Sequence, residues 1–245
     1  MSRMDAWQNL LSEASAIGLE LDSDALAKLK RYYALLIEGN KKANLTRITD
    51  EREAVIKHFL DSLTVLSVLP RELRERKLSF IDVGTGAGFP GIPLLIVCPN
   101  WHGVLLDATG KKVAFLAESI QALELDGLAL HGRAEEVARD PAHRDRYDLA
   151  FARAVAEMSA LSELCLPFVK VGGRFVAMKG SAGETELAKA RKAIKILGGA
   201  GIEVHALELP EGMGERRLIT VSKASATPKA YPRRTGMPNQ QPLGQ

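Results

Sequence analysis

The chain has 245 residues, of which 46% are hydrophobic and 26% charged, and its formal net charge is +3. This composition argues against a disordered chain and allows one large domain, or one domain with an appendage. Because no apolar run approaches the roughly 20 residues that span a bilayer, and the first residues lack the basic-then-apolar layout of a signal peptide, we expect a cytoplasmic protein with no membrane partner.

The first part of the chain carries helical spacing throughout. Apolar residues recur at helical intervals in three runs, over residues 5–19, 22–42 and 50–69. The third run opens with Asp50 and Glu53, which approximate a capping box. No long low-complexity linker follows these runs. We therefore predict a helical extension over residues 1–76 that packs on the remaining chain.

From residue 77 onward, short apolar runs alternate with helical patterns. The apolar runs, which are typical of buried parallel strands, cover residues 78–83, 103–108, 128–133, 147–153 and 174–179. Helical patterns lie between them at residues 111–125 and 157–170, and a third follows at 183–197. This alternation predicts an α/β protein with a doubly wound sheet over residues 77–223.

Two further strand candidates end this region. Residues 202–210 and 216–223 follow one another through EGMGE with no helix between them. Such a connection predicts a hairpin, so one strand should run antiparallel to the others. The sheet then has seven strands.

The tail at residues 224–245 is rich in proline and basic. From Lys223 to the end of the chain there are four basic side chains and no acidic one. By composition alone, this segment is either a solvated end or an arm that contacts phosphates. The only cysteines, Cys98 and Cys165, lie among apolar neighbours, and the five histidines are scattered. We therefore predict neither a disulfide nor a metal site.

The stretch FIDVGTGAGFPGIPLL, residues 80–95, places glycines directly after the first strand. A glycine-rich turn there brings bare backbone to the carboxyl edge of the sheet, where doubly wound folds bind ligands. Gly84, Gly86 and Gly88 form a G-x-G-x-G pattern, whereas Gly86, Gly88 and Gly91 form the G-x-G-x-x-G pattern of dinucleotide folds. A tight turn without any ligand is the third interpretation.

Two features, Asp82 and the terminal hairpin, favour S-adenosyl-L-methionine over a dinucleotide, and a third, Asp107, supports the site without choosing between them. Asp82, at the end of the first strand, would repel a pyrophosphate but can interact with the cationic aminoacyl part of the methyl donor. Asp107 ends the second strand, where it can accept hydrogen bonds from ribose hydroxyls of either cofactor. The terminal hairpin is typical of methyltransferase sheets, whereas a dinucleotide oxidoreductase, the outside alternative, would continue in βαβ units.

Several motifs together carry a resemblance to a known family. They are NLTRI (44–48), HFLDSL (58–63), DVGTGAGFPGIPL (82–94), KKVAFL (111–116), RAEE (133–136), ARAVA (152–156), MKG (178–180) and YPRRTGMPNQQPL (231–243). Over nearly its whole length the sequence resembles bacterial ribosomal RNA small subunit methyltransferase G, also called glucose-inhibited division protein B. The resemblance implies a Rossmann-like sheet and a cytoplasmic enzyme that uses S-adenosyl-L-methionine to methylate N7 of guanine 527, in the 530 loop of 16S ribosomal RNA.

The resemblance also implies where the cofactor binds. It places cofactor contacts at Gly84, Phe89, Asp107, Ala108, Thr109, Ala134, Glu135 and Arg153, and the bare turn adds Gly86 and Gly88. Phe89 could equally be a core residue, and Glu135 could simply favour a helix start. Arg153 ends an apolar strand, so it needs a partner; we expect the cofactor carboxylate or Asp82.

Guanine N7 carries a lone pair and no proton, so no general base is needed and we assign no catalytic residue. The sequence lacks the motifs that other methyl acceptors require, which agrees with N7 as the acceptor. It has no D/N-P-P-Y/F turn for amino-group methylation, and Cys165 lies in an apolar stripe unsuited to pyrimidine C5 chemistry. Lys179 could serve a 2′-hydroxyl acceptor, but Arg153 stands where that chemistry needs an aspartate.

The expected partner is 16S ribosomal RNA or a small ribosomal subunit in assembly, bound by a monomer. Candidate RNA contacts are Asn44, Arg47, Lys179, Arg233 and Arg234, because polar and basic groups at the rim contact phosphates. Asn44 could instead end a helix. The alternatives are a methyltransferase of another RNA or of a small molecule, and a noncatalytic RNA-binding protein of ribosome assembly.

Overall fold

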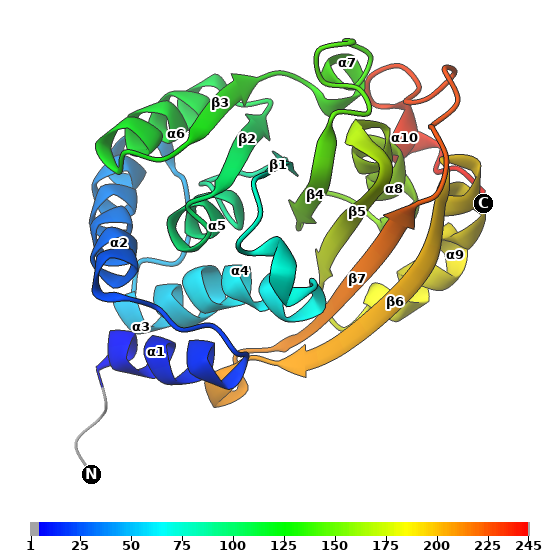
Figure 1. The fold of residues 1–245 in the computed structure, drawn as a ribbon. Helices are drawn as coiled ribbons and strands as arrows, with labels where there is room; N and C mark the ends of the chain where they lie inside the picture. Colours follow the sequence, from blue (N-terminus) through cyan, green and yellow to red (C-terminus); the bar gives the residue numbers. More distant parts are fainter. Residues whose placement is uncertain (1–4, 245) are drawn as a thin grey trace.

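The computed structural model describes residues 5–244 and has a seven-stranded sheet at its centre (Figure 1). The strand order is β3 (Gly127–His131), β2 (Trp101–Asp107), β1 (Leu78–Val83), β4 (Tyr147–Arg153), β5 (Val169–Lys179), β7 (Glu215–Lys223), β6 (Gly199–Glu208). Strand β7 is antiparallel to both β5 and β6, and the remaining pairs are parallel. The predicted doubly wound sheet with a C-terminal hairpin is therefore confirmed.

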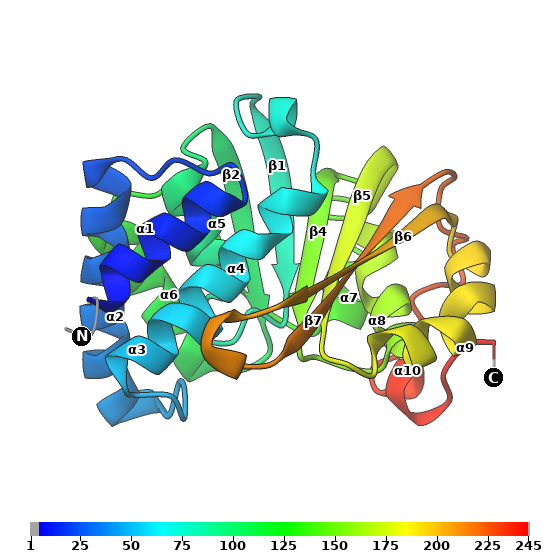
Figure 2. The same ribbon diagram turned by 90° about the horizontal axis from the view of Figure 1, so that it is seen from below.

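Helices cover both faces of the sheet, as Figure 2 shows. Side chains that alternate along each strand feed two hydrophobic clusters, with Phe80 of β1 in one and Ile81 in the other. The first cluster joins the sheet to α1 (Ala6–Ala16), α2 (Ser23–Ala43), α5 (Gly91–Val97) and α6 (Gly110–Ala122). The second joins it to α8 (Met158–Cys165) and α9 (Gly183–Ile196).

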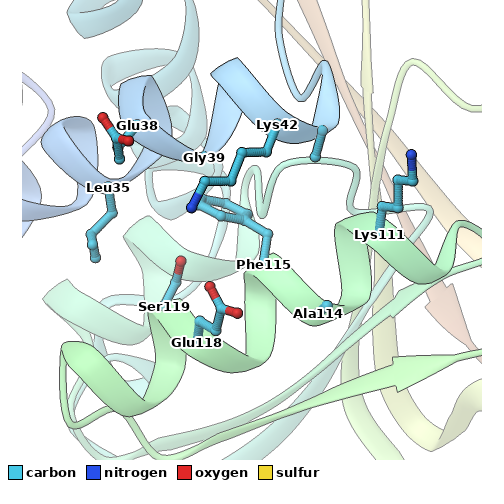
Figure 3. Close-up of a pocket in the computed structure, with 10 residues that line it drawn as sticks. Leu35, Glu38, Gly39, Lys42, Lys111, Ala114, Phe115, Glu118 and Ser119 are labelled. Atoms are coloured by element: carbon cyan, nitrogen blue, oxygen red, sulfur yellow. The ribbon is translucent and has the colours of Figure 1, made fainter.

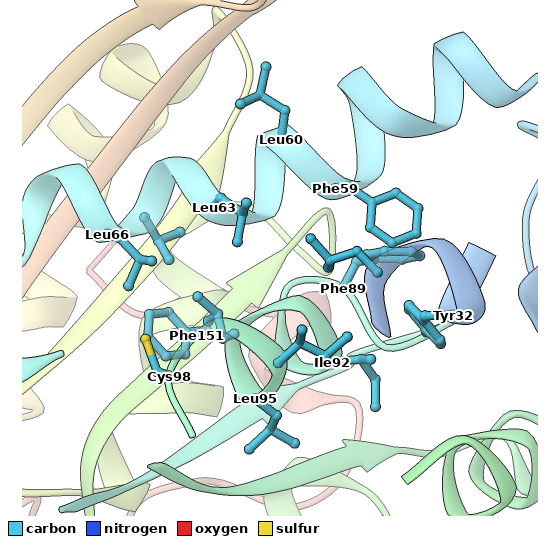
Figure 4. Close-up of a cluster of buried hydrophobic side chains, with 14 of the residues drawn as sticks. Tyr32, Phe59, Leu60, Leu63, Leu66, Phe89, Ile92, Leu95, Cys98 and Phe151 are labelled. Atoms are coloured by element: carbon cyan, nitrogen blue, oxygen red, sulfur yellow. The ribbon is translucent and has the colours of Figure 1, made fainter. Parts of the chain in front are cut away.

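The N-terminal helices thus share a hydrophobic core with the sheet. Figure 4 shows part of that core, where Tyr32 and Phe59 lie near Phe89 and Ile92. Tyr32 and Phe59 are fully buried, and each packs its ring against Phe89. The conformation of the glycine turn therefore depends on the helical extension.

The helical run predicted over residues 50–69 is not one regular helix. It consists of α3 (Glu51–Ala54), the π-helical turn η1 (Val55–Leu60), α4 (Asp61–Leu63) and the 3₁₀ turn η2 (Thr64–Val68). Asp50 caps its start, because the carboxylate accepts a hydrogen bond from the Glu53 backbone N–H at 2.8 Å. π-Helical turns often lie at functional sites, so residues of η1 are candidates for such a site.

The remaining elements are short. They are η3 (Arg71–Leu73), α7 (Ala134–Val137), η4 (Leu166–Phe168), η5 (Pro210–Gly212) and α10 (Met237–Gln240). Both cysteines are free and buried. Within residues 5–244, no helix is long and apolar enough to cross a membrane, and no group of three or more His, Cys, Asp or Glu side chains could hold a metal ion.

Candidate functional site

The glycine turn between β1 and α5 has a backbone that other residues rarely adopt. Gly84, Gly86 and Gly88 all have positive φ angles, of +70°, +63° and +90°. A Cβ atom on Gly88 would lie 2.5 Å from the hydroxyl oxygen of Tyr32, which itself donates a hydrogen bond to the Ala87 carbonyl. Glycine is therefore required at this position, and α2 fixes the turn through Tyr32.

Asp82 lies beneath this turn and is fully buried. Its Oδ2 accepts hydrogen bonds from the Thr85 hydroxyl at 2.6 Å and from the Gly91 backbone N–H at 2.9 Å. Its Oδ1 is buried without a hydrogen-bond partner in the described chain. Burial raises the pKa of this carboxyl to about 6. A cationic ligand group nearby would compensate the buried charge.

We define the edge pocket as a cavity of about 220 Å³ at the carboxyl ends of β1, β2 and β3. It is lined by Val83, Gly84, Leu106, Asp107, Ala108, Gly132, Arg133, Ala134, Glu135, Val155, Leu164 and Asn239. The structure thus brings together five of the predicted cofactor residues, from three separate segments. Asp107 shapes the pocket, because its carboxylate accepts hydrogen bonds from the N–H groups of Gly86 (2.9 Å) and Thr109 (2.8 Å).

We define the arginine pocket as a second cavity, of about 400 Å³, centred on two arginines. It is lined by Ile48, Lys57, His58, Asp61, Arg153, Ala154, Met178, Lys179, Gly180, Glu186 and Arg216. The Asp61 carboxylate, only 1% exposed, lies 3.1 Å from Arg153 Nη1 and 2.8 Å from Arg216 Nε. The acidic partner of Arg153 in the protein is therefore Asp61, and the expected pairing with Asp82 was wrong. The other expected partner, the cofactor carboxylate, stays a prediction.

His58, which lines the arginine pocket, is stacked on a core phenylalanine. The rings of His58 and Phe89 are nearly parallel, with centroids 4.6 Å apart, and the Arg153 guanidinium lies 5.3 Å from the Phe89 ring centre. Burial, together with the positive charge of Arg153, lowers the pKa of His58 to about 4. His58 is consequently neutral at neutral pH. Phe89 is buried in the core and is not among the lining residues of either pocket.

The loop after β4 separates the two pockets. Ala154 lines the arginine pocket and the next residue, Val155, lines the edge pocket. Ala154 has a positive φ of +54°, which is strained for a residue other than glycine. Val155 packs so closely over Gly84 that a Cβ there would lie 2.7 Å from its Cγ2 atom. The two cavities therefore lie on either side of one residue pair at the carboxyl edge of the sheet.

The predicted RNA-contacting residues have different surroundings. Asn44 is the exposed C-cap of α2 in the left-handed conformation, and Arg47 and Arg234 are exposed. Lys179 lines the arginine pocket, where its amino group bonds Glu186 at 2.7 Å. Arg233 differs from the expectation of a free basic group, because its side chain pairs with the buried Glu163 at 2.8 Å.

Sequence reasoning did not select several residues that shape the two pockets. They are Tyr32, His58, Asp61, Arg216 and Asn239. The motif HFLDSL places His58 and Asp61 three residues apart, which is compatible with a simple i, i+3 pair on one helix. In the structure both side chains contact Arg153, with His58 Nδ1 3.4 Å from Arg153 Nη2. The π-helical turn between them was not visible in the sequence pattern.

A third cavity lies apart from both pockets. It measures about 330 Å³, lies between α2 and α6 and is largely apolar (Figure 3). Phe115, Gly39 and Ser119 line it, and none of its lining residues belongs to the edge pocket or the arginine pocket. We therefore do not include it in the site.

The buried Asp82 predicts a specific pH dependence of stability. Because its pKa rises from the usual 3.8 to about 6 on folding, the folded state binds this proton more tightly than the unfolded state. The stabilisation is complete below about pH 4 and is lost as the pH rises through 6. Calorimetry of the ligand-free protein should show that Asp82→Asn gains stability relative to wild type between pH 4 and 7. A difference that stays constant with pH would contradict this.

The fold and the site define the class of Rossmann-like methyltransferases. Two solved structures share the fold: the S-adenosylmethionine-dependent O-methyltransferase from Thermotoga maritima (TM-score 0.50, 16% identity, 78% of this chain and 71% of that chain) and cofactor-bound Rv0187 from MTB (TM-score 0.54, 16% identity, 79% and 89%). The family model of rRNA small subunit methyltransferase G matches residues 25–219. The chain belongs to this family.

Relatives that match over nearly their whole length agree with that membership. Ribosomal RNA small subunit methyltransferase G of Lactobacillus johnsonii is 47% identical over 94% of this chain and 97% of its own length. The protein of the same name from Staphylococcus saprophyticus is 45% identical over 97% of this chain and 98% of its own length. The resemblance inferred from the motifs is thus confirmed.

Proposed function

We propose that this protein transfers a methyl group from S-adenosyl-L-methionine to N7 of a guanine in the 530 loop of 16S ribosomal RNA. The observation that carries the proposal is that the edge pocket and the arginine pocket are neighbours, on either side of Ala154 and Val155. The edge pocket suits the methyl donor and the arginine pocket suits the acceptor. Neighbouring pockets would hold the two reactants close together, as methyl transfer requires. Family membership supports ribosomal RNA as the acceptor.

The residues of the edge pocket fit the proposed cofactor. Asp107 and Glu135 offer carboxylate oxygens to ribose hydroxyls and to an exocyclic amine, while the glycine turn admits a ligand close to the backbone. Asp82 does not line the pocket but lies buried beneath the glycine turn, where its unpaired Oδ1 would favour a cationic aminoacyl group bound nearby. When bound, S-adenosyl-L-methionine supplies an electrophilic methyl group on a sulfonium.

The arginine pocket provides what a neutral, unprotonated acceptor needs. Guanine N7 attacks with its own lone pair, so no residue has to remove a proton. The guanine becomes cationic as the bond forms, and surplus positive charge would oppose this step. Asp61 is shared by Arg153 and Arg216, so it offsets one of their two positive charges. Lys179 is paired with Glu186 and Lys57 with Glu53, and His58 carries no charge at neutral pH. These residues position the base while limiting the positive charge around it.

RNA would then be held by exposed groups around the pockets. Asn44 and Arg47 follow α2, Lys179 borders the arginine pocket, and Arg234 lies on the tail. We leave Arg233 out of this set because Glu163 engages it. Phosphate contacts of this kind make binding fall with salt. We further propose a cytoplasmic monomer, with residues 1–76 supporting a methyltransferase core at 77–223 and residues 224–245 as a functional tail.

A methylation assay tests the proposal. Purified protein is incubated with S-adenosyl-L-methionine and small ribosomal subunits whose 530 loop lacks methylation, and the RNA is digested and analysed by mass spectrometry. We expect one 7-methylguanosine per RNA, in the 530-loop fragment, and none when the RNA is already modified. Methylation of a small molecule only, or binding of RNA without any methyl transfer, would overturn the proposal.

A further inference from the structure

The C-terminal tail folds back over the carboxyl edge of the sheet (red in Figure 1), where α10 packs against α8. Backbone carbonyls along the tail accept hydrogen bonds from two core arginines. Arg144 donates to the carbonyls of Thr227 (2.7 Å) and Tyr231 (2.8 Å), and Arg139 donates to that of Pro232 (2.6 Å). The tail is therefore attached to the core at several points before it reaches the edge pocket.

A buried ion pair then fixes the tail's direction. Glu163 of α8 is fully buried, and Oε1 accepts hydrogen bonds from the Arg233 backbone N–H (2.7 Å) and from Arg233 Nε (3.0 Å). Its Oε2 accepts a further bond from Nη2 at 2.8 Å. A buried carboxylate without such a partner would be costly. Docking of the tail thus satisfies Glu163, and release of the tail would leave that charge unpaired.

After the Glu163–Arg233 ion pair, the tail reaches the edge pocket itself. The Gly236 backbone N–H donates to Glu135 Oε1 at 2.9 Å, and the Thr235 hydroxyl donates to Glu136 at 3.0 Å. Three residues later, Asn239 lines the edge pocket together with Asp107 and Glu135. Asn239 is exposed to solvent, so its amide is available to a ligand.

We propose that Asn239 is a cofactor-binding residue and that the docked tail forms the outer wall of the nucleoside end of the cofactor site. An asparagine amide both donates and accepts hydrogen bonds, as the ring nitrogens and exocyclic amine of an adenine require. Because only the docked tail presents Asn239, cofactor binding and tail docking stabilise each other by the same factor. This inference rests on the proposed function and extends it.

Calorimetric titration with S-adenosylhomocysteine, the stable product, tests the inference. We expect Asn239→Ala to weaken binding about three- to tenfold, the effect of one lost hydrogen bond. Glu163→Gln weakens the contact with Arg233 without leaving a buried carboxylate charge when the tail is released. If the fraction of molecules with a docked tail falls to about a tenth, the dissociation constant of S-adenosylhomocysteine rises about tenfold. Lys229→Gln is the matched control, because Lys229 is an exposed basic residue of the same tail, and it should bind like wild type.

Limited proteolysis gives a second readout that does not depend on catalysis. We expect S-adenosylhomocysteine to slow trypsin cleavage after the exposed Arg234 in wild type, and to protect Glu163→Gln less. Wild-type affinity in both variants, with no protection of Arg234 in wild type, would overturn the inference while leaving the proposed function intact. A wild-type protein that binds no S-adenosylhomocysteine would overturn both.

Discussion

Asp61→Ala is expected to lower the free energy of unfolding by about 3–5 kcal/mol, as removal of one partner of a buried ion pair does. The Asp61 carboxylate is the shared partner of Arg153 and Arg216 and is almost fully buried. Without it, two guanidinium groups face one another around the arginine pocket. Methyl transfer should also fall sharply, because the acceptor becomes cationic in a pocket that is now strongly positive.

The matched control is Glu184→Gln, which removes an acidic partner of Arg217 on the surface. The Glu184 side chain is 62% exposed, so its loss should cost no more than about 1 kcal/mol. Chemical denaturation measures both variants, and the methylation assay of the 530 loop measures their activity. Equal stability of the two variants would show that the ion pairs of Asp61 with Arg153 and Arg216 do not stabilise the fold as the structure indicates.

Gly88→Ala is expected to destabilise the protein by about 2–5 kcal/mol, from overpacking and from the strain of a positive φ. Its Cβ would lie 2.5 Å from the Tyr32 hydroxyl oxygen, 2.7 Å from Ile92 Cγ1 and 2.9 Å from Leu116 Cδ2. Tyr32 would have to move, and its hydrogen bond to the Ala87 carbonyl would be lost. The glycine turn should then bind S-adenosylhomocysteine much more weakly.

Gly180→Ala is the control for that substitution, because a Cβ at Gly180 meets no atom within 4 Å and its backbone needs no positive φ. Thermal unfolding of both variants should show a large drop in midpoint for Gly88→Ala and almost none for Gly180→Ala. A small effect at Gly88 would mean that α2 does not hold the turn.

The strands were the most predictable part of the fold. The bounds predicted for β1 and β4 from apolar runs are the same as those in the structure, because a buried parallel strand is uniformly apolar. Strand β5 was predicted from residue 174 but begins at Val169. Gly172 and Gly173 interrupt the apolar pattern, whereas in the structure the strand continues through them with an irregularity in its pairing with β4. A Cβ at Gly173 would lie 2.5 Å from the Asp148 carbonyl oxygen.

The two pockets differed in how far sequence could predict them. The predicted residues that line the edge pocket follow β1, β2 and β3, so the adjacent carboxyl ends of these strands bring them together by topology alone. The arginine pocket depends on Asp61, whose partners lie 92 and 155 residues later in the chain. No local pattern indicates such a pairing. Likewise, Glu163 lies in an apolar run, and only the fold shows that Arg233 turns inward to meet it.

The central claim is that the glycine turn holds a methyl donor for guanine N7. Its most direct test is deletion of the gene, followed by analysis of 16S ribosomal RNA for 7-methylguanosine in the 530 loop. We expect that modification to disappear and to return with the intact protein, but not with a Gly86→Asp variant, whose side chain would add a carboxylate at the turn. Persistence of the modified guanine in the deletion strain would contradict the claim.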